Sequence, residues 1–191
     1  LLATLNARYN HASLGLRYLY ANLESLQPQA ELMEFTIAMR PLDIAEQILA
    51  KQPKIVGFGV YIWNVTETTA VIGLLKTLAP QLIIVLGGPE VSYEAANQSI
   101  TASADYVISG AAEQSFRDLC LAVLTDARPA AKFIQSPLLP LAELQLPYAA
   151  YTDTDLKQRF IYIEASRGCP FKCEFCVSAL DKPAYPFEVA H

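Results

Sequence analysis

The sequence predicts an α/β domain built on a doubly wound parallel sheet, followed by the start of a second domain. Short apolar runs of strand length alternate with segments in which apolar residues recur every three or four positions, as in amphipathic helices. The 191 residues are 53% hydrophobic and 17% charged, which is enough apolar material for a core and excludes a disordered chain. Beyond residue 124 this alternation ends, because prolines interrupt every long element.

The strands and helices of the first domain are placed by their patterns. Strands are expected at residues 1–5, 31–36, 55–60, 82–86 and 105–109. The third and fourth are apolar and β-branched throughout, which is typical of central strands buried on both faces. Helices are expected at residues 14–26, 41–50, 66–78, 93–96 and 113–124. The first carries a stripe of leucines that ends at Gln27-Pro28, and the second opens at Pro41.

Five strands that alternate with helices form a parallel sheet covered on both faces. Right-handed crossovers leave few topologies, and the one we expect is flavodoxin-like, with the strand order 2-1-3-4-5. In such sheets ligands bind outside the carboxyl ends of the strands. For this chain those ends lie at residues 6–11, 61–64, 87–91 and 110–113.

Composition excludes several partners. The net charge is -5 and the isoelectric point is about 5.0, so there is no basic excess to favour nucleic acid. The longest apolar runs have the length of a strand, far below the roughly 20 residues of a membrane span. The chain opens at Leu1 without Met and without a basic signal-peptide region. We therefore expect a cytoplasmic protein, and a segment trimmed at least at its carboxyl end.

Residues 125–158 are expected to form an extended linker, with prolines at positions 129, 137, 140 and 147. After it, residues 159–164 alternate as a new strand that leads into a cysteine cluster. This gives a division into a first domain at residues 1–124, a linker at 125–158 and the start of a second domain at 159–191.

Four cysteines divide into one isolated residue and a cluster. Cys120 lies on the apolar face of a predicted helix and is expected to be a core residue. Cys169, Cys173 and Cys176 form a Cys-x3-Cys-x2-Cys loop. Three thiolates at this spacing suit an iron–sulfur cluster and leave one iron open to a further ligand. A zinc site completed by another residue, or a disulfide with a spare thiol, fits the spacing and the compartment less well.

The cysteine loop resembles that of the radical S-adenosylmethionine enzymes. Phe175 matches the aromatic residue that often precedes the last cysteine, and residues 164–170 resemble the usual approach to the motif. The resemblance covers about the last thirty residues. It implies the start of a (β/α) barrel in which Cys169, Cys173 and Cys176 bind a [4Fe-4S] cluster and Phe175 lies near the adenine of S-adenosylmethionine. The chemistry implied is reductive cleavage to a 5′-deoxyadenosyl radical, with a one-electron donor such as flavodoxin or ferredoxin.

The first domain is similar to the cobalamin-binding domain of the cobalamin-dependent branch of that family. The similarity rests on its architecture and on the Leu-Gly-Gly-Pro-Glu run after the fourth strand. It implies that the strand-end loops contact cobalamin, with these residues as candidates: Asn6, His11, Tyr61, Trp63, Asn64, Gly87, Gly88, Pro89, Glu90 and Gly110. The first loop lacks the Asp-x-His-x-x-Gly pattern whose histidine ligates cobalt, so we expect a base-off cobalamin without a histidine ligand. The fifth strand's exit has alanines where relatives carry an acidic residue, which predicts weaker binding.

Two functions from different classes follow. The first is a cobalamin-dependent radical S-adenosylmethionine enzyme that transfers a methyl group or rearranges an unreactive carbon, with this segment inactive by itself. The second is a non-catalytic module that binds cobalamin or a nucleotide. A response-regulator receiver shares the sheet order, but the strand ends lack its acidic cluster.

Overall fold

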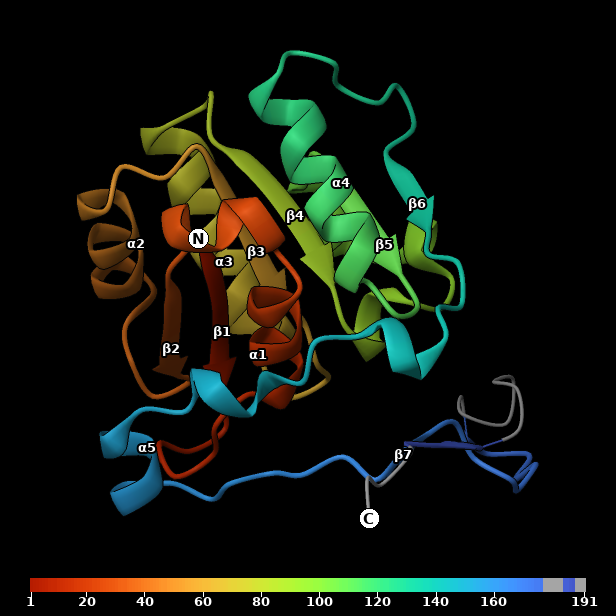
Figure 1. Ribbon diagram of the computed structural model, residues 1–191. Helices are drawn as coiled ribbons and strands as arrows, with labels where there is room; N and C mark the ends of the chain where they lie inside the picture. Colours follow the sequence, from red (N-terminus) through yellow and green to blue (C-terminus); the bar gives the residue numbers. More distant parts are fainter. Residues whose placement is uncertain (177–183, 188–191) are drawn as a thin grey trace.

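The computed structural model describes residues 1–176 and 184–187. At its centre is a parallel sheet of six strands in the order β2-β1-β3-β4-β5-β6 (Figure 1). The strands are β1 Leu2–Asn6, β2 Leu32–Thr36, β3 Ile55–Gly59, β4 Ile83–Gly87, β5 Tyr106–Ser109 and β6 Phe133–Gln135. The predicted α/β class and the order 2-1-3-4-5 are confirmed.

Four helices cover the sheet and a fifth follows it. They are α1 Leu14–Ala21, α2 Pro41–Ala50, α3 Val65–Leu78, α4 Glu113–Leu124 and α5 Asp153–Gln158. Helices α2 and α3 pack on one face, and α1 and α4 on the other (Figure 1). A small antiparallel pair, β7 Ser166–Arg167 and β8 Tyr185–Pro186, lies apart from the main sheet. No helix in the described part of the chain has the length and apolar character needed to cross a membrane.

Two hydrophobic clusters, one on each face, hold these layers together. Along β4, Ile84 and Leu86 pack toward α2 and α3, whereas Ile83 and Val85 pack toward α1 and α4. This alternation follows from the two-residue period of a strand. Each fully buried aliphatic side chain such as Ile84 contributes about 1.5–3 kcal/mol to stability.

The sixth strand was not predicted. β6 pairs in parallel with β5 through Ile108 and Ile134 at the sheet edge, within the segment expected to be a linker. Phe133 and Gln135 are exposed and the strand has three residues, so it lacks the continuous apolar run of the central strands. An edge strand of this kind leaves little signal in a sequence.

Three local predictions were wrong. Helix α1 ends at Ala21, because the Asn22 side chain binds the Tyr18 carbonyl, and a 3-10 helix, Glu24–Gln29, follows it. The helix predicted at 93–96 is absent from the described residues. Glu94 has a φ of 47°, and short 3-10 turns occupy Pro89–Val91, Ala95–Asn97 and Ser99–Ser103. The strand predicted at 159–164 is extended, but within the described chain it makes one isolated bridge, Phe160 to His11.

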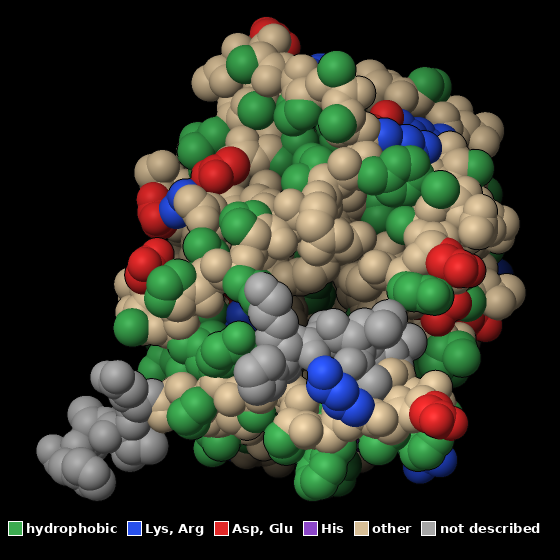
Figure 2. Space-filling view, turned by 90° about the vertical axis from the view of Figure 1, so that its right-hand side faces the viewer, with side chains coloured by type: hydrophobic (Ala, Val, Ile, Leu, Met, Phe, Trp, Pro, Cys, Tyr) green, Lys and Arg blue, Asp and Glu red, His purple; other side chains and the backbone are tan. Residues whose placement is uncertain are grey.

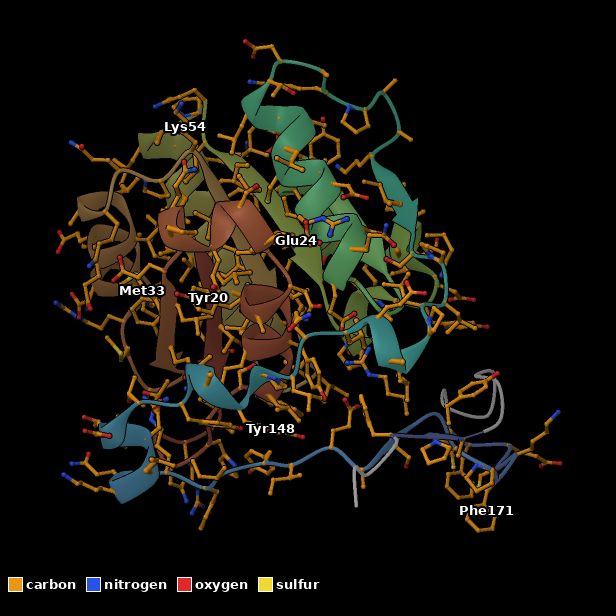
Figure 3. All side chains as sticks on the ribbon, viewed as in Figure 1. Tyr20, Glu24, Met33, Lys54, Tyr148 and Phe171 are labelled. Carbon is orange, nitrogen blue, oxygen red and sulfur yellow. The ribbon has the colours of Figure 1, made fainter. Side chains whose placement is uncertain are left out.

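Residues 145–167, which we call the strap, run along the carboxyl ends of the strands (Figure 1). The strap begins where Gln145 exchanges two hydrogen bonds with the Asn22 side chain and continues through a 3-10 helix, Pro147–Ala150, and α5. Tyr148, on the strap beneath α1, holds the far end of the strap through hydrogen bonds to the Glu164 backbone (Figure 3). The strap is therefore attached to α1 at Gln145, and its two halves are joined to each other through Tyr148.

Candidate cofactor-binding site

Backbone contacts join the loops that leave β3 and β4. The Val60 amide donates to the Gly87 carbonyl at 2.7 Å, and the Glu90 amide donates to the Val60 carbonyl at 3.4 Å. Gly88 has a φ of 110°, and a β-carbon there would lie 2.4 Å from the Val60 oxygen. Only glycine allows this approach. The absence of a side chain at Gly88 therefore allows the two strand-end loops to pack against each other.

An aromatic pair lies on the β3 exit loop. The rings of Tyr61 and Trp63 stack with centroids 4.5 Å apart and an angle of 11°. Trp63 is 48% exposed, so the pair presents apolar surface to solvent. Burial raises the pKa of the Tyr61 hydroxyl, which therefore stays protonated at neutral pH. Ile62 and Tyr93 add exposed apolar surface to the same two loops; we did not predict their role, because a sequence does not show which loop side chains stay exposed.

Asn64 lies beneath that pair rather than beside it. Its side chain is fully buried, its amide group donates to the carbonyls of Leu5 and Gly59, and its oxygen accepts from the Tyr61 amide at 2.8 Å. The side chain thus fixes the β3 exit loop against the end of β1. Asn64 can contribute to a cofactor site by positioning Tyr61, not by contact.

The two candidates on the β1 exit loop are bound within the protein. The Asn6 side chain donates to the His11 carbonyl at 2.8 Å and to Glu34 at 3.1 Å. The His11 ring stacks on Tyr162, its Nδ1 is 2.5 Å from the Tyr162 hydroxyl, and Phe160 meets its edge. The strap thus covers the loop that leaves the carboxyl end of β1.

The remaining loop candidates are spread along the carboxyl ends of the strands. Pro89 is exposed and Glu90 half-buried at the start of the turn after β4. Gly110 has a φ of 88° and lies beside Ser136, which follows β6. The structure therefore places the candidates after β3 and β4 together, with Gly110 nearer the β6 edge and Asn6 and His11 under the strap.

A buried group of four charges fixes the strap to the domain. Arg17 pairs with Glu34 and with Asp155, both at 2.9 Å, and Arg159 pairs with Glu34 at 2.8 Å. The four side chains are between 3% and 10% exposed. We did not predict this group, because its members are up to 142 positions apart, the interval between residues 17 and 159.

The cysteine cluster lies beyond the strap. Cys169 is half-buried, Cys173 and Cys176 are exposed, and no bond joins them to one another. In the part of the chain that the structure describes, no three His, Cys, Asp or Glu side chains are close enough to hold a metal ion. Phe175 is 93% exposed, and Phe171 points away from the sheet domain (Figure 3). Three thiols are the correct donor chemistry for an iron–sulfur cluster, but the structure does not gather them around one point.

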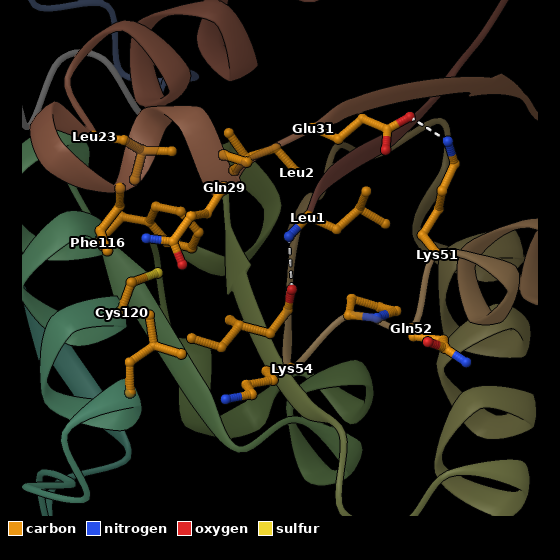
Figure 4. A pocket seen from close by; sticks show the side chains of 15 residues that line it. Leu1, Leu2, Leu23, Gln29, Glu31, Lys51, Gln52, Lys54, Phe116 and Cys120 are labelled. Atoms are coloured by element: carbon orange, nitrogen blue, oxygen red, sulfur yellow. Dashed lines mark hydrogen bonds and ion pairs between the residues drawn. The ribbon is translucent and has the colours of Figure 1, made fainter.

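A cavity lies at the other end of the sheet, where the strands begin. It has a volume of about 290 Å³ and lies between the start of β1, the Lys51–Ile55 segment and α4 (Figure 4). Its wall includes Cys120, whose pKa burial raises to about 11, so the thiol is protonated at neutral pH. Cys120 is a buried core residue, as predicted. This cavity lies at the amino ends of the strands, away from the loops that bind ligands in such sheets.

Comparison with known families agrees with the geometry of the carboxyl edge. The family model described as "B12 binding domain" matches residues 1–120. The chain belongs to the B12-binding domain family. Within the B12-binding domain, the match includes the β1, β3, β4 and β5 exit loops and ends inside α4.

Two curated relatives are similar to the chain. The cobalamin-dependent radical SAM methyltransferase TokK of Streptomyces tokunonensis is 27% identical over 149 residues. The 2-(S-pantetheinyl)-carbapenam-3-carboxylate methyltransferase of Streptantibioticus cattleyicolor is 26% identical over 154 residues. Each match covers 65% of this chain and 22% of the relative, so the chain spans about a fifth of the length of the curated relatives it matches.

Proposed function

We propose that this chain binds cobalamin on its β3–β4 loops and belongs to a radical S-adenosylmethionine methyltransferase. The observation that carries the proposal is the presence, on one chain, of a B12-binding domain and a Cys-x3-Cys-x2-Cys motif. Relatives that match the chain are named as methyltransferases, one of them as a cobalamin-dependent radical SAM enzyme.

The residues of the carboxyl edge fit a corrin. A flat macrocycle needs a flat apolar surface, which the stacked Tyr61–Trp63 pair supplies, and close access to backbone, to which the half-buried Gly87 and Gly88 add no side chains. Cobalamin, when bound, supplies a cobalt centre that carries a methyl group. The residues that would hold the macrocycle are Trp63 and the backbone near Gly88.

For the second cofactor we propose that Cys169, Cys173 and Cys176 hold a [4Fe-4S] cluster to which S-adenosylmethionine binds, with Phe175 near its adenine. The donor set supports this assignment. A flavodoxin- or ferredoxin-like protein is the reductant we propose. The surface beside α4 and β6 carries a mixture of acidic, basic and hydrophobic side chains (Figure 2). We also propose that the protein is cytoplasmic and acts on small molecules.

Cofactor uptake tests the proposal. The 191-residue chain, reconstituted without oxygen, is expected to bind iron and sulfide at about four each per chain. The Cys173→Ala/Cys176→Ala variant is expected to lose the cluster, and Cys120→Ala to retain it. Hydroxocobalamin is expected to co-elute with the chain in gel filtration. Zinc without iron would contradict the enzyme, and a colourless protein peak would contradict cobalamin binding.

A non-catalytic cobalamin- or nucleotide-binding module is the second candidate. It is favoured by the extent of the family match, which covers residues 1–120 and ends before the cysteine loop. Cobalamin uptake without any iron uptake by the anaerobic chain would select this module over the enzyme.

Trp63→Ala is expected to weaken cobalamin binding about tenfold, because an aromatic stacking contact contributes about 0.5–1.5 kcal/mol beyond its buried area. Phe133→Ala is the matched control, since Phe133 is similarly exposed on the distant edge strand β6. Titration followed by visible absorbance measures both affinities. An equal loss of cobalamin affinity in the two variants would show that Trp63 does not contact cobalamin.

His11→Ala is expected to leave the visible spectrum of bound cobalamin unchanged. The His11 ring is packed against Tyr162 and Phe160, and its Nδ1 is already hydrogen-bonded. A spectrum of histidine-ligated cobalamin in the original chain, lost in the variant, would show that His11 leaves the strap and binds cobalt.

A further inference from the structure

Arg167 is the last residue held in place before the cysteine loop. It lies in β7 and is followed by Gly168, whose φ of 84° turns the chain toward Cys169. Glycine adopts this left-handed backbone without strain. The position of Arg167 therefore sets where the cysteine loop starts.

The Arg167 guanidinium makes three contacts. It pairs with Glu113 at 2.6 Å and with Glu164 at 3.1 Å, and it lies over the Tyr18 ring at 4.6 Å from the centroid. Glu164 is three residues before Arg167 on the strap, but Glu113 and Tyr18 belong to the B12-binding domain. Arg167 thus joins the end of the strap to α4 and α1.

Glu113 is buried at a point that matters for the proposed site. It is the first residue of α4, directly after the β5 exit loop, and its side chain is 6% exposed. Its second carboxylate oxygen is buried and has no hydrogen-bond partner among the residues that the structure describes. The nearby Arg117 is engaged with Glu24 and Asp118. A buried carboxylate is costly without a paired cation, so Glu113 needs Arg167.

We propose that Arg167 is a positioning residue that clamps the entrance of the cysteine loop to the β5–α4 junction of the B12-binding domain. The clamp fixes the separation between the three thiols and the carboxyl edge of the sheet. The conclusion that this separation holds an iron–sulfur cluster at a fixed distance from cobalamin rests on the proposed function. The contact between Arg167 and Glu113 does not.

Trypsin tests the clamp, because it cleaves after Arg167. In the 191-residue chain the guanidinium is engaged, and cleavage at Arg167–Gly168 is expected to be slow. Glu113→Gln leaves the cleavage site intact but weakens the pair. It is expected to speed this cleavage about tenfold relative to cleavage after Lys51, an exposed residue in the turn after α2, since breaking a buried pair eases local opening. Asp118→Asn removes an exposed carboxylate from the same helix and is the matched control.

Equal relative cleavage in the original chain and in Glu113→Gln would overturn the clamp. If Glu113→Gln unfolds the chain and cleavage rises at both bonds, Glu113→Asp replaces it. This variant keeps the negative charge at the start of α4 and shortens the reach toward Arg167, so it is expected to speed cleavage at Arg167–Gly168 only.

A spectroscopic measurement tests the consequence. Reduced cluster and cob(II)alamin are both paramagnetic, so their magnetic coupling depends on their separation. The loaded chain is expected to show one well-defined coupling, and Glu113→Gln a weakened and broadened one, with unchanged iron and cobalamin contents. Identical coupling in both would overturn the positioning role. Failure to load either cofactor would contradict the proposed function, and the trypsin result would still decide the clamp.

Discussion

Asp155→Ala is expected to destabilise the chain by about 3–5 kcal/mol, the cost of removing one partner from a buried ion pair. Arg17 and Arg159 would then share the single carboxylate of Glu34 in a place where the side chains are at most 10% exposed. The loss of the capping box at the start of α5 adds to the effect. Urea unfolding followed by circular dichroism measures the free energy of unfolding.

Asp153→Ala is the control, because Asp153 is an exposed acid in the first turn of the same helix. Its loss is expected to cost less than about 1 kcal/mol. A destabilisation by Asp155→Ala no larger than that of Asp153→Ala would show that the strap does not depend on the buried charges.

The Asp155 carboxylate also makes the stability of the chain dependent on pH. Burial opposes ionisation of Asp155, but hydrogen bonds from Thr152 and Arg17 outweigh burial and lower its pKa below the usual value. A group with a lowered pKa in the folded state contributes stability above its unfolded pKa of about 3.9, and this stability is lost as the pH falls through the folded value. The original chain is therefore expected to lose more stability than Asp155→Ala on going from pH 6 to pH 3.

Gly88→Ala is expected to destabilise the chain by more than about 3 kcal/mol and to abolish cobalamin binding. The new β-carbon would lie 2.4 Å from the Val60 oxygen and 2.9 Å from its nitrogen, and the φ of 110° is strained for alanine. Both contacts are with backbone, so relief requires the β3 and β4 exit loops to separate. Thermal unfolding and hydroxocobalamin titration measure the two losses.

Two further glycines provide controls. At Gly87 the added β-carbon would meet the Ile108 carbonyl at 3.6 Å, an ordinary contact, and Gly87→Ala is expected to fold normally. Gly73 lies inside α3, and an added β-carbon would meet no neighbouring atom of the described residues within 4 Å, so Gly73→Ala is expected to stabilise the chain by about 1 kcal/mol. Gly88→Ala with the stability of Gly87→Ala would show that the junction is not tight.

The sheet and its order could be predicted because the pattern that encodes them is local. Runs such as Ile55–Gly59 and Ile83–Gly87 are apolar at every position, which only burial on both faces of a sheet explains. The cysteine spacing and the glycine pair after β4 are local in the same sense. These two short patterns carry the family resemblance from which cobalamin and an iron–sulfur cluster are predicted, and sheet topology predicts that cobalamin binds at the carboxyl ends of the strands.

The contacts that these residues make could be learned only from the tertiary structure. The sequence predicts Gly88 and Asn64 as cobalamin contacts, which stays a prediction, but the structure shows that Gly88 packs against the Val60 backbone and that the buried Asn64 side chain holds the Tyr61 amide. The segment expected to be a linker became an edge strand and an attached strap, since Asp155 and Arg159 meet Arg17 and Glu34 only after the chain returns across the sheet. Apolar periodicity is written along the chain, whereas the pairing of buried charges depends on where distant segments meet.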